Sequence, residues 1–211
     1  MEKEDFKPKH SVESLTASVF STVFSPLLVP TYGVMAAMWL SILTLLPTGV
    51  KWSVISVTFA ITCLLPLLAI ITLWKLHIIK DPQLNNRTER TTPYLITFLC
   101  YLGCGFYLWR ANAPVWLFAL MFGGALATLI CIAVNTRWKI SAHMAAMGGL
   151  VALFFRIVAD GVEMVSMNGW LSVVVILAGC VGASRVLLER HTLGQVLAGT
   201  AVGFLCVYLL S

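Results

Sequence analysis

The chain has 211 residues, of which 59% are apolar and 11% are charged, and its mean hydropathy is +0.91. A soluble domain carries about 25% charged residues, so this composition excludes a water-soluble globular protein. The net charge of +5 is spread between apolar runs, and we expect the lipid bilayer, not nucleic acid, as its partner.

Residues 1–25 are predicted to form an N-terminal tail and an interfacial helix. The first apolar run starts late and has no small-residue cleavage site, so we do not expect a signal peptide. From Val12 to Phe24, apolar residues recur at helical spacing among serines and threonines, which is typical of a helix at a membrane surface. Pro26 and Pro30 then mark a bend, and residues 26–211 are expected to form a single transmembrane domain.

Charge-poor runs that approach the roughly 20 residues needed to cross a bilayer follow this bend. Backbone groups in lipid must be satisfied within each helix, so the sequence predicts an all-α, polytopic transmembrane bundle of six to seven helices. The sixth run is short for a full crossing. The predicted spans are Pro30 to Leu46, Trp52 to Leu76, Tyr94 to Trp109, Pro114 to Val134, His143 to Ala159, Leu171 to Ala183 and Gln195 to Leu210.

An even number of predicted helices separates the three polar stretches 80–93, 135–143 and 184–195. We therefore expect these stretches at the same membrane face, where their side chains can meet in one pocket. Eleven of the 14 lysines and arginines fall on this side, and the positive-inside rule would make it cytoplasmic. Cations that bind phosphate would lie there for another reason, so the sequence leaves the facing open. We expect an integral protein of the bacterial inner membrane.

The first polar stretch carries a lysine and an arginine separated by six residues. Lys80 and Arg87 at this spacing can grip one phosphate with a point charge and a planar fork. Arg90 follows closely and is a further candidate phosphate ligand. The same residues would also suit an ordinary basic loop that touches lipid headgroups.

The second polar stretch places Ser141 and His143 where one predicted helix ends and the next begins. A hydroxyl and free backbone N–H groups at a helix start form an anion site, and a histidine there can exchange a proton near neutral pH. A capping serine beside an interfacial histidine is the alternative reading.

The third polar stretch has the most specific pattern. Ser184 and Arg185 are followed, after five residues, by His191 at the head of an apolar helix. Gln195 lies four residues later on the same helical face. It can hydrogen-bond one ring nitrogen of the histidine and leave the other nitrogen free to attack.

Taken together, these stretches resemble the type 2 phosphatidic acid phosphatase superfamily. Its pattern is Lys-x6-Arg-Pro, then Pro-Ser-Gly-His, then Ser-Arg-x5-His-x3-Asp. The resemblance covers Lys80 to Gln195 with the same order, spacing and membrane context. It implies a helical phosphatase core in this membrane protein.

The resemblance also implies a role for each matching residue. His191 would be the nucleophile that forms a phosphohistidine, and His143 would be the general acid. Gln195 would hold the nucleophile in place of the family's aspartate. The phosphate-binding residues would be Lys80, Arg87, Arg90, Ser141, Ser184 and Arg185.

All three motifs differ from the family pattern. Thr88 replaces the proline of the first motif, and Ile140 and Ala142 replace the proline and glycine of the second. Gln195 can fix the tautomer of His191, but it carries no charge to stabilise an imidazolium. Because the motifs have changed together, we expect a pocket rebuilt around glutamine.

We thus expect a hydrolase of lipid phosphates or pyrophosphates that uses neither a metal ion nor another cofactor. The six cysteines lie inside apolar runs and are interpreted as packing residues. Two alternatives remain: a non-catalytic lipid-phosphate binder or flippase-like protein, and a small transporter with a midplane site. Polar residues clustered at one face argue against the transporter. The sequence leaves open which lipid is bound and whether the chain forms a homo-oligomer.

Overall fold

The computed structural model describes residues 12–81 and 87–211. Six helices in this part of the chain are long and apolar enough to cross a membrane, which confirms the predicted all-α polytopic bundle. No strand occurs among the described residues. The N-terminal tail as far as residue 11, and residues 82–86 of the first polar stretch, lie outside them.

One predicted span, Trp52 to Leu76, is a single helix from Thr48 to Lys75 with a π-helical turn inside it. The turn precedes Pro66, which has no N–H to donate to the preceding turn. In chain order, the helices of the described residues are α1 (Val12–Val23), α2 (Val29–Leu40), η1 (Ile42–Leu45), α3 (Thr48–Phe59), η2 (Ala60–Leu64), α4 (Leu65–Lys75), η3 (Arg87–Glu89), α5 (Thr91–Arg110), α6 (Val115–Asn135), α7 (Ala142–Ala159), α8 (Met167–Leu187) and α9 (Leu193–Leu210).

Helix α8 is longer than predicted. The sequence predicts a short span from Leu171 to Ala183, whereas α8 has 21 residues and continues past Ser184. The Ser184 hydroxyl donates to the carbonyl of Cys180 at 2.7 Å. Because its polar group is satisfied within the helix, this serine does not end α8. The helix is therefore long enough for a full crossing.

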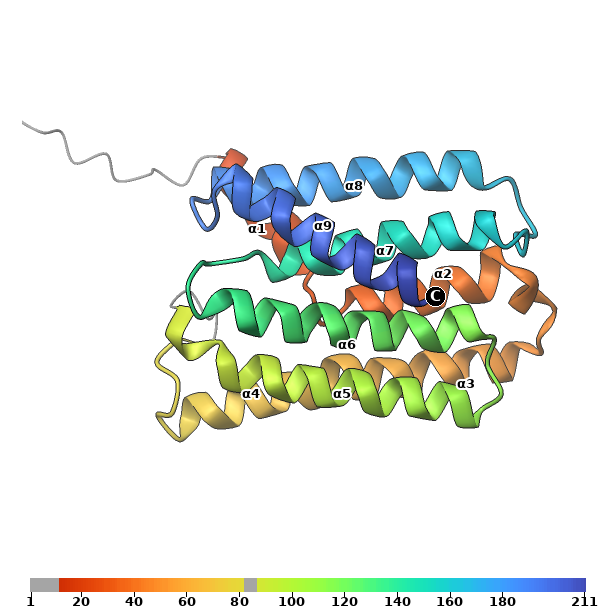
Figure 1. Ribbon diagram of the computed structural model, residues 1–211, viewed down its shortest axis with the longest axis horizontal. Helices are drawn as coiled ribbons and strands as arrows, with labels where there is room; N and C mark the ends of the chain where they lie inside the picture. Colours follow the sequence, from red (N-terminus) through yellow and green to blue (C-terminus); the bar gives the residue numbers. More distant parts are fainter. Residues whose placement is uncertain (1–11, 82–86) are drawn as a thin grey trace, which may run out of the picture.

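The three polar stretches meet at one end of the bundle, as predicted. Figure 1 shows segments 76–81, 87–90, 136–141 and 188–192 together at the left, and the remaining connections between the long helices at the right. We call the left end the polar end. The pattern of polar stretches thus predicted which side chains share a face.

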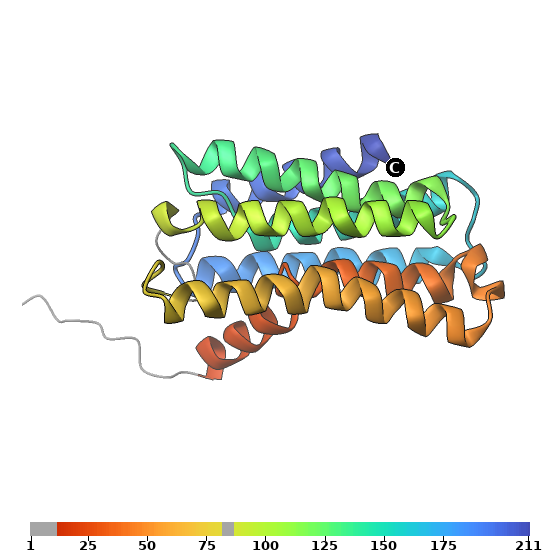
Figure 2. The ribbon, with the colours of Figure 1, turned by 90° about the horizontal axis from the view of Figure 1, so that it is seen from below.

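The first crossing is broken into two short helices. Helix α1 packs against α8 near the polar end, and α2 continues toward the opposite end after a break at 24–28. Figure 2 shows α1 leaning away from the long helices below the bundle. Pro26 lies in the break, whereas Pro30 lies in the first turn of α2, where its missing N–H removes no helical hydrogen bond.

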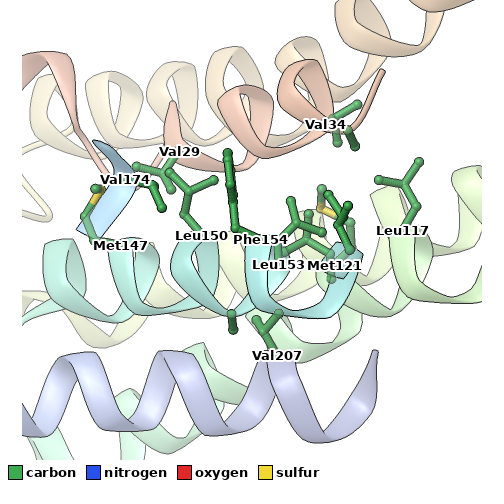
Figure 3. Close-up of a cluster of buried hydrophobic side chains, with 14 of the residues drawn as sticks. Val29, Val34, Leu117, Met121, Met147, Leu150, Leu153, Phe154, Val174 and Val207 are labelled. Carbon is green, nitrogen blue, oxygen red and sulfur yellow. The ribbon is translucent and has the colours of Figure 1, made fainter. Parts of the chain in front are cut away.

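The hydrophobic core is centred on α7. Figure 3 shows its apolar side chains surrounded by those of four other helices. Because these side chains pack against other helices and not against lipid, they fix α7 between its neighbours. The labelled core residues are Met147, Leu150, Leu153 and Phe154 of α7, Val29 and Val34 of α2, Leu117 and Met121 of α6, Val174 of α8 and Val207 of α9.

Helices α7 and α9 approach each other closely because glycines line their contact. A side chain at Gly203 would collide with the backbone carbonyl of Ala145, and one at Gly199 would meet the carbonyl of Ser141 at 2.5 Å. Small residues allow this kind of helix contact in membranes. The N–H of Ser141 also donates to the carbonyl of Gln195 at 3.4 Å. The starts of α7 and α9 therefore lie side by side at the polar end.

We predict that Gly203→Ala lowers the free energy of unfolding by about 1–3 kcal/mol, the usual cost of overpacking. The added methyl group would meet the backbone of α7, which cannot turn aside. Gly179→Ala on α8 is the matched control, since nothing lies within 4 Å of the added carbon. Thermal unfolding in detergent should give a lower Tm for Gly203→Ala alone. Equal Tm values for the two variants would contradict this account of the contact.

Candidate functional site

A cavity of about 510 Å³ extends from the polar end into the bundle. Part of its lining is apolar and lies far from that end: Leu120 and Met121 belong to the half of α6 near the opposite end. No aspartate or glutamate lines the cavity among the described residues. Its histidines and arginines are Arg90, His143, Arg185, Arg190 and His191.

A tight turn after α8 directs His191 into this cavity. The N–H groups of Arg190 and His191 both donate to the carbonyl of Arg185, at 3.1 and 3.2 Å. Glu189 adopts the left-handed conformation with φ +54°, which costs a residue with a side chain about 1–2 kcal/mol. The chain thereby reverses at once, and His191 is buried with 6% of its surface exposed.

Gln195 fixes the tautomer of His191. Its Oε1 lies 2.9 Å from Nδ1 of the imidazole and 3.4 Å from the N–H of Thr192. The backbone N–H requires an acceptor, so the oxygen of the amide faces the ring, and Nδ1 must carry the hydrogen. Thr192 and Gln195 also form the capping box of α9. The other ring nitrogen, Nε2, is left with its lone pair.

His191 is neutral at physiological pH. Burial lowers its pKa from 6.5 to about 4, and the cations Arg90, Arg185 and Lys139 act in the same direction, against the opposing effect of the bond to Gln195. Burial also lowers the pKa of Lys139, followed by repulsion from nearby arginines. Both shifts reflect burial, together with repulsion between the cations that gather at this site.

His143 offers a hydrogen-bond donor on Nε2, whereas His191 offers a lone pair on the same ring atom. It is the second residue of α7, and its Nε2 lies 3.0 Å from the backbone carbonyl of Ser21. A carbonyl oxygen only accepts, so this Nε2 carries a hydrogen. One cavity histidine thus offers a lone pair and the other offers an N–H.

Two of the arginines are held by contacts from other segments. Arg185 donates through Nη1 to the hydroxyl of Ser21 at 2.6 Å, while its Nε is buried without a partner. Arg90 is 5% exposed and donates through Nη1 to the carbonyl of Ile140 at 3.3 Å. Cations gather around this cavity and no carboxylate of the described residues lines it, so the cavity suits an anionic ligand.

The predicted serines have structural partners close to the cavity. Ser141 is fully buried and accepts from the N–H of Met144 at 3.4 Å as the N-cap of α7. Ser184 bonds within α8. Neither side chain lines the cavity, and Gln195 contributes through His191 rather than by lining it.

Lys80 and Arg87 lie at the polar end outside the cavity lining, and both are exposed. The backbone N–H of Lys80 donates to Oε2 of Glu89 at 2.8 Å. The carbonyl of Arg87 accepts from Nδ2 of Asn135 at 2.7 Å. These contacts hold the first polar stretch against α6, and Arg90 is the cation of that stretch that reaches the cavity.

Sequence reasoning missed Ser21 and Arg190, which both line the cavity. A signal for the first was present: Ser14, Ser18, Ser21 and Ser25 recur at spacings of three and four, which predicts a hydroxyl stripe on one helical face. Ser18 and Ser25 line the cavity as well. Arg190 follows the third motif and had no local pattern to mark it.

The described residues contain no group of three or more histidine, cysteine, aspartate or glutamate side chains placed to hold a metal ion. The six cysteines are free thiols, and all but Cys180 are buried. What the site does offer is a set of cationic and imidazole groups around an apolar cavity.

Comparison of the chain with protein-family models, with curated proteins and with solved structures gave no match.

Proposed function

We propose that this integral membrane protein is a lipid phosphatase of the bacterial inner membrane that works through a phosphohistidine intermediate. One observation carries the proposal: a histidine with a bare ring nitrogen and a histidine with an N–H line the same cation-rich cavity. A nucleophile and a general acid are the two groups that phosphate ester cleavage needs. The resemblance of the three polar stretches to the motifs of the phosphatidic acid phosphatase superfamily also supports the proposal.

In the first step, Nε2 of His191 attacks the phosphorus atom, and the bond from phosphorus to the leaving oxygen breaks. His143, which takes up a second proton as the phosphate binds, passes its Nε2 hydrogen to that oxygen and returns to the neutral imidazole, so the lipid leaves as an alcohol. The guanidinium groups of Arg90 and Arg185 balance the charge on the phosphoryl oxygens. Because His191 is neutral before substrate binds, it needs no deprotonation to act.

In the second step, His143 takes a proton from water, and the resulting hydroxide attacks phosphorus. The bond between phosphorus and Nε2 of His191 then breaks, which releases inorganic phosphate and restores both histidines. Gln195 keeps Nδ1 of His191 protonated throughout, so that the same nitrogen acts in each turnover. None of these steps draws on a metal ion or cofactor.

The shape of the cavity supports a lipid substrate. Its polar groups lie at the end of the bundle, where a headgroup would sit near the membrane surface, and its apolar lining continues toward the bilayer centre. Leu67 and Ile71 of α4 form part of that lining. A lipid monophosphate or pyrophosphate fits this division, with its phosphate beside the histidines and its chain among apolar side chains.

A non-catalytic lipid-phosphate binder is the second candidate, and Gln195 is the residue that favours it. A neutral amide holds the imidazole but does not stabilise the positive charge that develops on it. Such a protein would keep the cationic cavity and release no phosphate.

We predict that the purified protein releases phosphate from lipid phosphates in the presence of EDTA. His191→Ala should reduce kcat by a factor on the order of 10⁶, as for other lost nucleophiles, and should leave no acid-labile phosphoenzyme. His143→Ala should cost about 10²–10⁴-fold with a lipid substrate, and less with an aryl phosphate whose leaving group needs no proton.

Loss of all activity in EDTA, with recovery on adding Mg²⁺ or Zn²⁺, would refute the phosphohistidine scheme. If an aryl phosphate restores His191→Ala but not His143→Ala, the two histidine roles are reversed. Ser172→Ala, on the exposed face of α8 at the opposite end, is the control and should retain full activity.

We further predict that Gln195→Asp lowers both kcat and Tm. The aspartate side chain is one methylene shorter, so it would lose the contacts with His191 and the N–H of Thr192. Loss of one such hydrogen bond costs about 1 kcal/mol, while the hydroxyl of Thr192 still caps α9. Gln195→Glu is the matched variant: it keeps the reach, adds the charge and should retain or raise kcat. A clear gain in kcat for Gln195→Asp would show that the pocket is not built around glutamine.

A further inference from the structure

Helix α1 rests on the bundle through a narrow face. Its buried residues are Ala17 and Ser21, which are four positions apart and so lie on one side of the helix. Val12, Leu15 and Val19 are exposed by 78%, 66% and 53%. The helix packs on α8, but it barely touches α4, although both helices line the cavity. One wall of the cavity is therefore attached along a single stripe.

Ser21 contacts Arg185 and His143, the two side chains that must contact the substrate in the proposed reaction. Its hydroxyl accepts from Nη1 of Arg185 at 2.6 Å, and its carbonyl lies 3.0 Å from Nε2 of His143. An imidazole nitrogen carries one hydrogen, so His143 cannot serve this carbonyl and a leaving oxygen at the same time. Catalysis by His143 therefore requires Ser21 to move away.

The contact made by Ser21 leaves the site incompletely satisfied. The Nε of Arg185 is buried without a partner while α1 is in place. A phosphate offers several charged acceptor oxygens, and a guanidinium binds such groups with two of its nitrogens. Exchange of Ser21 for phosphate would thus satisfy a donor that the serine leaves unpaired.

The junction between α1 and α2 supplies a hinge. The hydroxyl of Tyr101 donates to the carbonyl of Pro26 at 3.1 Å, and the hydroxyl of Tyr32 donates to the carbonyl of Val23 at 3.0 Å. These bonds hold the last residue of α1 against α2 and the break at 24–28 against α5. Helix α1 can then turn about a fixed point while its far end leaves α8.

We propose that α1 is a lid over the cavity, closed by Ser21 on Arg185 and His143 and opened when a phosphate group takes the place of Ser21. The role of this lid in turnover rests on the proposed phosphatase function. Its movement, however, is measurable without turnover. The ligand that opens it is a phosphate group, either free or on a lipid.

The test places a reporter on the buried stripe of α1. In Ala17→Cys, labelling of position 17 by a water-soluble maleimide is followed by peptide mass spectrometry, so that the native cysteines stay in place. Leu15→Cys, on the exposed face, reports any general change in reactivity. Each is examined with Ser21→Ala and with the matched control Ser18→Ala, which changes another serine of the same helix, one that makes neither contact.

We expect Ser21→Ala to raise the labelling rate at position 17 by about tenfold, the scale of one lost hydrogen bond to a charged group. Ser18→Ala should leave the rate unchanged. In the parent protein, inorganic phosphate and a short-chain phosphatidic acid should both raise the labelling rate at position 17. If opening needs the lipid chain, only the phosphatidic acid should raise this rate. Equal rates in both serine variants, with no response to either phosphate, would overturn the lid.

Phosphate release by the same preparations separates the two proposals. An active protein whose labelling does not depend on Ser21 refutes the lid and leaves the phosphatase standing. A protein that releases no phosphate from any lipid, but opens in Ser21→Ala, refutes the phosphatase and supports a phosphate-gated binding site.

Discussion

The close contact between α7 and α9 determines where the two histidines of the cavity lie. Because the glycines at this contact have no side chains, the two backbones approach closely. The N–H of Ser141 then donates a hydrogen bond to the carbonyl of Gln195. His143 follows the first of these residues by two positions, and His191 precedes the second by four. Both histidines therefore reach one cavity, although 47 residues separate them in the chain (143 to 191).

The electrostatics of the cavity follow from this packing. Arginines from the start of α5 and the end of α8 converge on the histidines, and no carboxylate among the described residues lines the same space. Repulsion from nearby cations adds to burial in lowering the pKa of His191, so that its Nε2 keeps a lone pair. A bound phosphate would reverse the sign of that field and stabilise an imidazolium. The ligand itself would then supply part of the charge that a neutral glutamine at position 195 does not provide.

Apolar runs were enough to predict the bundle and the shared face of its polar stretches, because lipid permits few other arrangements of a polar backbone. Local spacing did not reveal which cation enters the cavity: the contact between Asn135 and Arg87 leaves that arginine outside, while Arg90 lies within. The serine spacing near the N-terminus indicates a hydroxyl face, but it does not reveal that Ser21 contacts Arg185, a residue 164 positions away. Such contacts depend on how helices pack, which a motif does not encode.

A structure of the protein with bound orthovanadate tests the central claim most directly. Vanadate adopts the five-coordinate geometry of phosphoryl transfer, and transition-state analogues bind more tightly than substrates. We predict vanadium bonded to Nε2 of His191, with the guanidinium groups of Arg90 and Arg185 on its oxygens and Ser21 displaced. Vanadate bound at Lys80 and Arg87 outside the cavity, with His191 still bare, would contradict the account.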